Sequence, residues 1–326
     1  MKINIFTAIA LALTLCFVAP SNSADTYPEK PITILLATAA GGGSDITLRR
    51  MQPFFEKALG TKLLFEYEGG GGTSIAATMV AKRPADGYTM LSIGSPHYQF
   101  TFVLQKVGYT IDDLYPVGPY NFDPAVVRVS KDAPWNNLND LVEFAKSKPA
   151  KTVKVSVGQR TSNNFLSLKQ IEQTAGVSFN IVPYSGGNPA RLALINGEVD
   201  MTNVGLFNSL PIAAKTKVLA VHYHENRWPN LTNNAKTVND QLGVKLNDSA
   251  ITDGLWVAGK LRKEYPARYD FLVKALNKVL TDPAYIAEMK KLGLEDQLIR
   301  QDPETCDKES RRIVEDLKKY KELFTN

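Results

Sequence analysis

The chain has 326 residues, of which 44% are hydrophobic and 22% are charged. This composition excludes a disordered chain, a collagen-like chain and a multispan membrane protein, and the length is sufficient for two domains. The 38 Lys and Arg residues outnumber the 33 Asp and Glu residues, which gives a net charge of +5. No basic stripe accompanies this small excess, so we expect no nucleic-acid partner.

Residues 1–24 have the pattern of a secretory signal peptide. A single lysine is followed by the apolar run Ile3–Val18 and then by the small polar stretch Ser21–Ala24. The apolar run is shorter than the roughly 20 residues that a membrane anchor needs. We therefore predict cleavage after Ser23 or Ala24 and a processed chain that does not span the membrane.

Beyond residue 24, short apolar runs alternate with longer helical periods, which predicts an α/β fold with a largely parallel sheet. The predicted strands are Ile32–Ala37, Leu63–Phe65, Tyr88–Ile93, Ala125–Val129, Val153–Val157, Phe179–Val182 and Val199–Asn203. The predicted helices are Asp45–Leu59, Ser74–Ala81, Leu138–Lys146, Phe165–Thr174, Pro189–Ile195, Ala267–Leu280 and Pro283–Leu292. Strand-to-helix junctions with small or polar residues favour anions, because helix N-termini present unpaired N–H groups there.

Glycines concentrate at two of these junctions. The run Gly41–Gly43 lacks the lysine of a nucleotide P-loop and the spaced glycines of a dinucleotide-binding loop, so neither cofactor is supported. Three adjacent glycines instead allow close approach of the backbone to a small ligand, and Ser44 or Asp45 is expected to cap the next helix. The run Gly69–Gly72 would alone indicate a linker, but its place between a strand and a helix predicts a second wall of backbone donors.

Catalytic and metal sites have little support in the sequence. The chain has three histidines and no Gly-x-Ser-x-Gly nucleophile motif. His222 and His224 alternate along a strand-like segment, but no third metal ligand follows at a useful spacing, so we predict no metal and no cofactor. His97 follows a strand end and is a candidate hydrogen-bonding residue. Cys306 has acidic neighbours, which raise the pKa of a thiol, and is expected to be unreactive.

Short motifs occur along the chain in a distinctive order and spacing. In chain order they are Tyr27-Pro28-x-Lys30-Pro31-Ile32, Gly41-Gly42-Gly43-Ser44-Asp45, Gly69–Gly72, Ala85-Asp86-Gly87-Tyr88-Thr89, Val182-Pro183-Tyr184-Ser185-Gly186-Gly187-Asn188-Pro189-Ala190, Asn196-Gly197-Glu198-Val199-Asp200, Leu276-Asn277-Lys278, Asp282-Pro283 and Gly293-Leu294-Glu295. With these motifs the chain resembles the periplasmic solute receptors of tripartite tricarboxylate transporters, the Bug family. The resemblance covers nearly the whole processed chain.

The resemblance implies a two-lobed periplasmic-binding-protein fold of the Venus-flytrap type (type II), in which the chain crosses twice between lobes. The crossings are expected near Asn121–Asp123 and Tyr223–Arg227, so that lobe one comprises residues 25–123 and 226–326 and lobe two residues 124–225. The resemblance also implies a monomeric periplasmic receptor without enzymatic activity. Such a receptor binds a small carboxylate through backbone N–H groups, hydroxyls and waters and delivers it to the membrane subunits of the transporter.

Carried over by position, the resemblance implies ligand contacts from both lobes. Those of lobe one are Gly41, Gly42, Gly43, Ser44, Asp45, Gly71, Gly72, Thr73, Ser95 and His97. Those of lobe two are Arg160, Thr161, Ser162, Asn163, Asn164, Tyr184, Gly186, Gly187 and, more weakly, Asn203. Hydroxyl and amide donors suit this task, because closure removes water from a carboxylate whose oxygens must keep hydrogen-bond partners. Valine at Gly42 or Gly72 is expected to abolish binding, since a Cβ would intrude where the ligand meets the backbone.

Departures from the family pattern leave the ligand open. Arg160 stands where family members often have glycine; facing the cleft it would pair with a carboxylate through two hydrogen bonds, and facing solvent it would be a loop cation. The other departures are Ala39-Ala40, Glu66-Tyr67-Glu68, Asn164 and Thr252-Asp253-Gly254. Two alternatives remain open: a sensor receptor of the same fold, and a secreted enzyme that uses His97 and Asp45 as acid and base.

Overall fold

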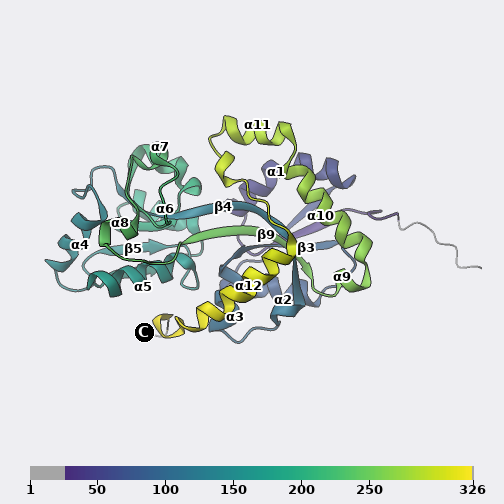
Figure 1. Cartoon of the computed structure of the whole chain (residues 1–326), viewed down its shortest axis with the longest axis horizontal. Helices are drawn as coiled ribbons and strands as arrows, with labels where there is room; N and C mark the ends of the chain where they lie inside the picture. Colours follow the sequence, from purple (N-terminus) through teal and green to yellow (C-terminus); the bar gives the residue numbers. More distant parts are fainter. Residues whose placement is uncertain (1–25, 325–326) are drawn as a thin grey trace, which may run out of the picture.

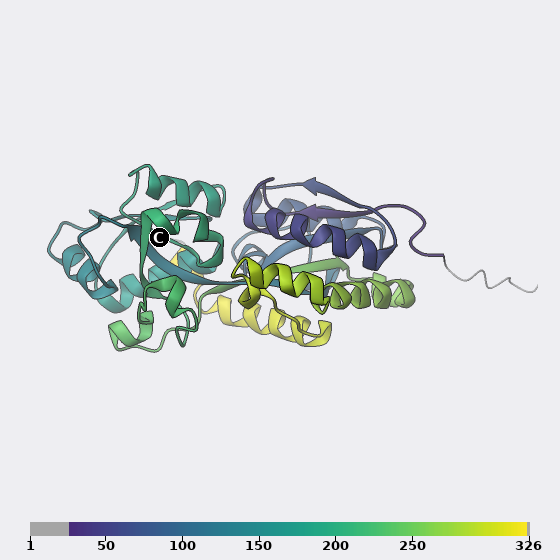
Figure 2. The ribbon, with the colours of Figure 1, turned by 90° about the horizontal axis from the view of Figure 1, so that it is seen from above.

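The structure is a computed structural model that describes residues 26–324. The predicted signal peptide and its cleavage site lie outside the described residues. Figure 1 shows two lobes along the long axis of the molecule, and Figure 2 shows the same lobes from above. Two long strands in the middle, β4 (Leu114–Ser130) and β9 (Ala250–Ala258), join the lobes. This arrangement is the predicted two-lobed α/β fold.

Lobe one contains the strand order β2-β1-β3-β9-β4. Its further strands are β1 (Ile32–Leu36), β2 (Leu63–Tyr67) and β3 (Thr89–Ser95). Its helices are α1 (Gly43–Leu59), α2 (Ser74–Lys82), α3 (His97–Leu104), α9 (Leu261–Glu264), α10 (Pro266–Leu280), α11 (Pro283–Lys291) and α12 (Pro303–Lys318). Because helices cover both faces of the sheet, β1 is apolar on both: Ile34 packs in the core with α1 and α10, and Leu35 packs toward α2.

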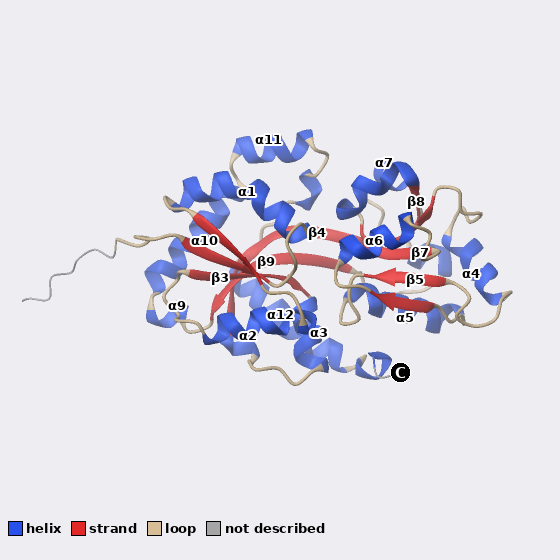
Figure 3. Cartoon of the chain, turned by 180° about the vertical axis from the view of Figure 1, so that it is seen from behind, coloured by secondary structure: helices blue, strands red, loops and turns tan. Residues whose placement is uncertain are grey.

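Lobe two contains the second half of β4, followed in the sheet by β7, β5 and β6, with β8 on the other side of β4. These strands are β5 (Lys154–Val157), β6 (Asn180–Pro183), β7 (Met201–Gly205) and β8 (Thr216–Val221). The helices are α4 (Leu138–Lys146), α5 (Asn163–Ala175), α6 (Gly187–Ile195), α7 (Pro229–Thr232) and α8 (Val238–Leu242). Figure 3 shows helices on both sides of these strands.

Every predicted strand and helix is present with small shifts at the ends, except that the predicted strand Ala125–Val129 is only the last part of β4. The sheet, however, is mixed rather than largely parallel, because β4 pairs antiparallel with β7, β8 and β9. The sequence predicted only Ala125–Val129 of β4, since Pro116, Gly118 and Pro119 interrupt the strand pattern before it. These residues fit because the pairing with β9 shifts register at two places there.

The unpredicted strand β9 contains Asp253-Gly254, a dipeptide typical of turns. Both residues have specific contacts that extended backbone permits. The Asp253 carboxylate accepts a hydrogen bond from Asn121 Nδ2 at 2.9 Å, and a Cβ on Gly254 would lie 3.3 Å from the Gly118 carbonyl oxygen. Tertiary contacts therefore override the local turn preference.

The chain crosses between lobes within β4 and again where β9 begins. β4 pairs with β9 as far as Pro124 and with β7 from Ala125, which is next to the expected first crossing. The return lies at residues 249–250, later than the expected Tyr223–Arg227. The intervening segment stays with lobe two, because Trp228 packs on Phe207 and α8 packs against α4 and β8. The polar turn near residue 225 is thus a loop within lobe two.

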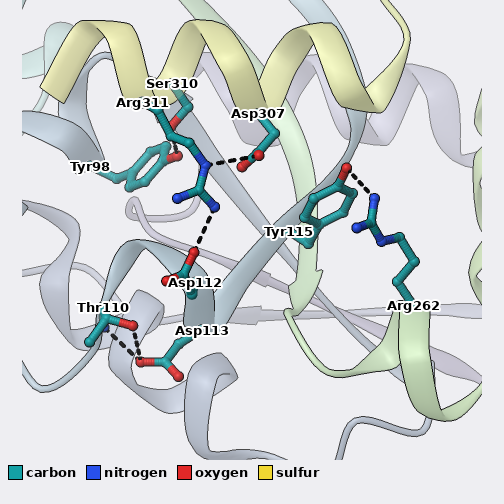
Figure 4. Close-up of polar contacts among 9 residues, drawn as sticks. All are labelled: Tyr98, Thr110, Asp112, Asp113, Tyr115, Arg262, Asp307, Ser310 and Arg311. Carbon is teal, nitrogen blue, oxygen red and sulfur yellow. Dashed lines mark hydrogen bonds and ion pairs between the residues drawn. The ribbon is translucent and has the colours of Figure 1, made fainter. Parts of the chain in front are cut away.

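The C-terminal helix α12 lies against lobe one and ends at lobe two. Figure 4 shows Arg311 of this helix between Asp307 and Asp112, with N···O distances of 2.9 and 2.7 Å. In the same view Arg262 binds the Tyr115 hydroxyl. Beyond α12, Phe324 packs in the lobe-two core. Within residues 26–324, no helix is both long enough and apolar enough to cross a membrane.

Candidate functional site

Two cavities lie on opposite faces of β9, because its side chains alternate between them. Ile251 and Asp253 line a cavity of about 250 Å³ that both lobes enclose, which we call the interlobe cavity. Thr252, Gly254 and Trp256 line a second cavity of about 560 Å³, which α12 borders. The loops that follow β1 and β6 border the interlobe cavity, so it is the candidate binding site.

The lobe-one wall is the loop from β1 into α1. No side chain caps the N-terminus of α1, so the predicted cap by Ser44 or Asp45 is wrong. Ser44 instead donates to Asp253 at 3.1 Å. Asp45 accepts the Gly41 N–H at 2.7 Å and the Tyr67 hydroxyl at 2.8 Å, and it contacts Arg49 at 2.9 Å. Asp45 thus holds the glycine loop from outside the cavity.

The lobe-two wall is formed by the starts of α5 and α6. Ser162 caps α5 by accepting the Phe165 N–H. The start of α6 has no side-chain cap, and Gly186 precedes it with φ +149°, a conformation that favours glycine. Gly187 and Arg191 of α6 line the cavity. The lobe-two wall therefore combines free helix N–H groups with an arginine side chain.

The lobes contact each other around this cavity. A Cβ on Gly43 would lie 2.7 Å from Asn208 Oδ1, and a Cβ on Gly72 would lie 2.5 Å from Thr161 Oγ1. His97 Nε2 and Asn163 Oδ1 are 3.1 Å apart. These glycines therefore allow two lobe surfaces to meet closely.

Polar groups without partners cluster at the interlobe cavity. Among the described residues, the side-chain oxygens Thr38 Oγ1, Thr73 Oγ1 and Gln159 Oε1 are buried and have no hydrogen-bond partner. All three residues line the cavity. Buried polar groups normally have partners, so such a cluster is typical of a ligand-binding site.

Burial shifts the pKa of four side chains at the cavity: it raises that of Asp123 and of Asp253 and lowers that of His97 and of Arg191. It raises the pKa of Asp123 to about 7, although the carboxylate accepts the backbone N–H groups of Phe207 and Asn208 at 2.8 and 3.2 Å. Burial also lowers the pKa of His97 to about 4, so this imidazole is neutral near pH 7. His97 thus adds no positive charge to the cavity near pH 7.

The structure brings about half of the predicted site residues to the interlobe cavity. Those that line it are Gly41, Gly42, Gly43, Ser44, Thr73, His97, Ser162, Asn164, Gly186 and Gly187. Those that do not line it are Asp45, Gly71, Gly72, Ser95, Arg160, Thr161, Asn163, Tyr184 and Asn203. Whether the first set touches a ligand stays a prediction.

The predicted residues outside the cavity have other contacts. Arg160 donates to the Phe324 carbonyl at 2.8 Å and lies over the Phe165 ring. It does not line the cavity and is exposed to solvent, which is the second of the two predicted alternatives. Tyr184 reaches the exposed Glu198. Asn203 is buried and donates to the Asn164 carbonyl oxygen within lobe two.

Further predicted residues lie at contacts between the lobes or in the second cavity, on the other face of β9. Ser95 and Asn163 line the second cavity. Gly72 meets Thr161 across the lobes, so valine there would obstruct closure rather than intrude on a ligand.

Sequence reasoning missed several residues that line the cavity, and four of them are Asp123, Arg191, Asn208 and Asp253. Two of them had a usable signal. Arg191 follows Gly187 by four residues and so lies on the same face of α6. Asp253 falls in one of the departures from the family pattern. Asp123 and Asn208 reach the cavity through the crossing strand and the turn after β7, which local pattern does not show.

The residues proposed for the enzyme alternative are not joined in one site. His97 lines the cavity, whereas Asp45 is bound outside it to Gly41, Tyr67 and Arg49. Within residues 26–324, no three His, Cys, Asp or Glu side chains are grouped to hold a metal ion. Burial and acidic neighbours raise the pKa of Cys306 to about 12, in the direction expected from its sequence context.

Comparison with known proteins places this geometry in a family. Residues 47–325 match the model of the tripartite tricarboxylate transporter family receptor. A UPF0065 protein of Agrobacterium vitis, from the TAR-I ttuE-ttuC' intergenic region, is 30% identical over 291 residues, covering 88% of this chain and 82% of that protein. The periplasmic binding protein BugD superimposes with a TM-score of 0.77 at 27% identity, covering 92% of this chain and 98% of BugD.

A further structure, Rpa4515 of R. palustris with adipate, superimposes with a TM-score of 0.81 at 24% identity. The match covers 92% of this chain and 98% of that one and concerns the fold. The family consists of receptors rather than enzymes. The chain therefore belongs to the tripartite tricarboxylate transporter receptor family, and it is a solute receptor.

Proposed function

We propose that this receptor binds a small carboxylate in the interlobe cavity and delivers it to the membrane subunits of a tripartite transporter. It does so as a monomer in the periplasm, after removal of the signal peptide. One observation carries the proposal: the uncapped N-termini of α1 and α6, from different lobes, border the same cavity.

Helix N-termini are suited to carboxylates. Each offers free backbone N–H groups and about half a positive charge. Glycines at both junctions let the ligand approach the backbone, and the unpartnered hydroxyls of Thr38 and Thr73 can turn to meet carboxylate oxygens. A carboxylate between the lobes would thus keep hydrogen-bond partners after water is removed.

Binding between lobes also provides a signal for delivery. A ligand that contacts both walls stabilises the closed form by its preferential affinity for that form. The membrane subunits can then distinguish loaded from empty receptor by the relative position of the lobes. The family description supports this role.

A thermal-shift screen tests ligand binding. The purified processed protein is screened with mono-, di- and tricarboxylates, aromatic acids and amino acids, with adipate included. A ligand at about 100 times its Kd stabilises the folded state by roughly 2.7 kcal/mol, which raises Tm visibly. No stabilisation by any acid of the panel would contradict the proposal.

Delivery needs a separate measurement. Tagged receptor is mixed with detergent-solubilised membranes of the source organism, with and without the best acid of the screen. We expect ligand-dependent capture of transporter membrane subunits. Capture of a signalling protein instead would show that the receptor is a sensor and would overturn the delivery proposal.

A further inference from the structure

The side chain of Arg191 is directed to the interlobe cavity by its place on α6. Helical side chains lean toward the N-terminus of their helix, and this end of α6 borders the cavity. Arg191 Nη1 accordingly lies 3.0 Å from the position that a Cβ would take on Gly187, four residues earlier. The residue lines the cavity although it is only 8% exposed. Its guanidinium is thus buried at the wall of the candidate site.

This guanidinium has no direct partner. Across the described part of the chain, no hydrogen bond or ion pair joins Arg191 to another residue. Asp123 interacts with it electrostatically, but the Asp123 carboxylate accepts backbone N–H groups from Phe207 and Asn208. A buried cation without a paired anion is costly. The cavity therefore favours an anion that completes this pair.

Arg191 also makes the two walls of the cavity different. Of the Lys and Arg residues within residues 26–324, Arg191 alone lines the cavity. The lobe-one wall offers backbone N–H groups at α1 and the unpartnered hydroxyls of Thr38 and Thr73, with no cationic side chain. One carboxylate can be bound by these neutral donors, and a second can be bound at the guanidinium.

We infer that Arg191 forms a direct ion pair with one carboxylate of the ligand, while the lobe-one wall binds another, so that the receptor selects dicarboxylates. This inference rests on the proposed function and adds the ligand class and the residue that determines it. Arginine suits the role because its planar fork binds a carboxylate through two parallel hydrogen bonds.

The test compares dicarboxylates with their monoamides. Isothermal titration calorimetry measures Kd for the dicarboxylates from succinate to adipate and for the monoamide of each. The wild type should prefer the best dicarboxylate over its monoamide. In Arg191→Gln the affinity for that dicarboxylate should fall by at least about 30-fold, because one partner of a buried charge pair is lost. The preference over the monoamide should disappear.

The preference for a dicarboxylate over its monoamide distinguishes a ligand-binding role of Arg191 from a purely structural one. If Arg191 only supports the fold, Arg191→Gln weakens both ligands equally and the preference persists, which overturns the inference. The matched control is Arg227→Gln, which removes an exposed arginine of lobe two that lies 3.7 Å from Glu225. It should leave both affinities unchanged.

Two further outcomes are decisive. If the wild type binds no carboxylate, the proposed function fails; if it binds one but shows no preference for dicarboxylates, only this inference fails.

Should Arg191→Gln not fold, Arg191→Lys takes its place, since lysine keeps the charge but cannot form two parallel hydrogen bonds to one carboxylate. We expect about tenfold weaker dicarboxylate binding in Arg191→Lys, and unchanged affinity would overturn the inference.

Discussion

The two walls of the interlobe cavity have the same backbone plan and different charge. On each side a strand runs through glycines into a helix whose N-terminus has no side-chain cap. Four residues after the first helical glycine, α1 has Thr47 and α6 has Arg191. The first turn of α1 also contains Asp45, whereas that of α6 has no acidic residue. One wall therefore relies on backbone and hydroxyl donors, and the other adds a full positive charge.

Similar strand-to-helix junctions therefore need not make similar contacts. Partial charges at a helix N-terminus bind a carboxylate without the desolvation cost of a buried cation. A guanidinium binds more strongly once an anion is present, but it needs that anion as a partner. The following predictions test the lobe-one wall, its support, the charge near Arg191 and a residue outside the cavity.

The largest effect is expected from Gly43→Val on the lobe-one wall. The new Cβ would meet the side chain of Asn208 at 2.7 Å, so the lobes could not close fully. Overpacking of this kind costs about 1–3 kcal/mol, which corresponds to roughly 5- to 150-fold in affinity. Calorimetric titration with the best acid of the panel measures the loss.

Asn208→Ala provides the control for this prediction. Combined with Gly43→Val, it removes the amide that the new side chain meets and should restore part of the lost affinity. Tm without ligand should change little in either variant, because Gly43 and Asn208 meet only across the lobes. Equal affinity of Gly43→Val and wild type would show that this contact does not govern closure.

A smaller loss is expected from Asp45→Ala, which removes the support of the glycine loop. The Gly41 N–H and the Tyr67 hydroxyl lose their acceptor, which should lower the free energy of unfolding by about 2 kcal/mol. Binding should weaken about tenfold if ordering the loop costs roughly 1.4 kcal/mol. Urea unfolding and calorimetry measure the two effects.

Asp282→Ala is the matched control for Asp45→Ala. Asp282 caps α11 by accepting the Ala284 N–H at 2.8 Å, and it does not line the interlobe cavity. Its loss should cost about 1 kcal/mol of stability and leave binding intact. If Asp45→Ala behaves in the same way, the glycine loop keeps its shape without Asp45.

The affinity for dicarboxylates should rise as pH falls from 8 to 6. Burial raises the pKa of Asp123 to about 7, so at lower pH its carboxyl is protonated and repels the ligand less. Asp253, Arg128 and Arg191 also act on Asp123 electrostatically, and His97, with a pKa of about 4, stays neutral in this range. If the bound ligand raises the pKa of Asp123 by one unit, the affinity for the dicarboxylate rises by up to about tenfold over this pH range.

The same shift has a defined sign for stability. Between about pH 4 and 7 the folded chain keeps a proton on Asp123 that the unfolded chain has released, so the contribution of Asp123 to stability falls as pH rises.

Calorimetry with a ligand fully ionised above pH 6 measures the effect of pH on binding. In Asp123→Asn the pH dependence should vanish; its persistence would assign it to another group.

The smallest effect on binding is expected from Arg160→Gln. Its hydrogen bond to the Phe324 carbonyl ties lobe two to the C-terminal segment, so its loss should lower stability by about 1 kcal/mol. Carboxylate affinity should stay at the wild-type value, since Arg160 does not line the cavity. A clear drop in affinity would instead place Arg160 among the ligand contacts.

Much of the fold could be predicted from sequence because its signals are local. The apolar run of β1, the glycines after it and the period of α1 occupy one continuous stretch. The strand β9 could not be predicted, because Asp253-Gly254 resembles a turn and is held extended by Asn121 and Gly118, more than 100 residues away. The return crossing was misplaced for a related reason, since Trp228 packs on the distant Phe207.

In the candidate site, too, some features follow from local sequence and others depend on contacts between distant segments. The family, the two-lobed class and the two glycine junctions follow from the sequence, because motif order and backbone preference are properties of neighbouring residues. The contact of Arg160 with Phe324 and the position of Arg191 at the cavity depend on tertiary packing. Both arginines belong to lobe two, and their different environments depend on which distant segments pack beside them.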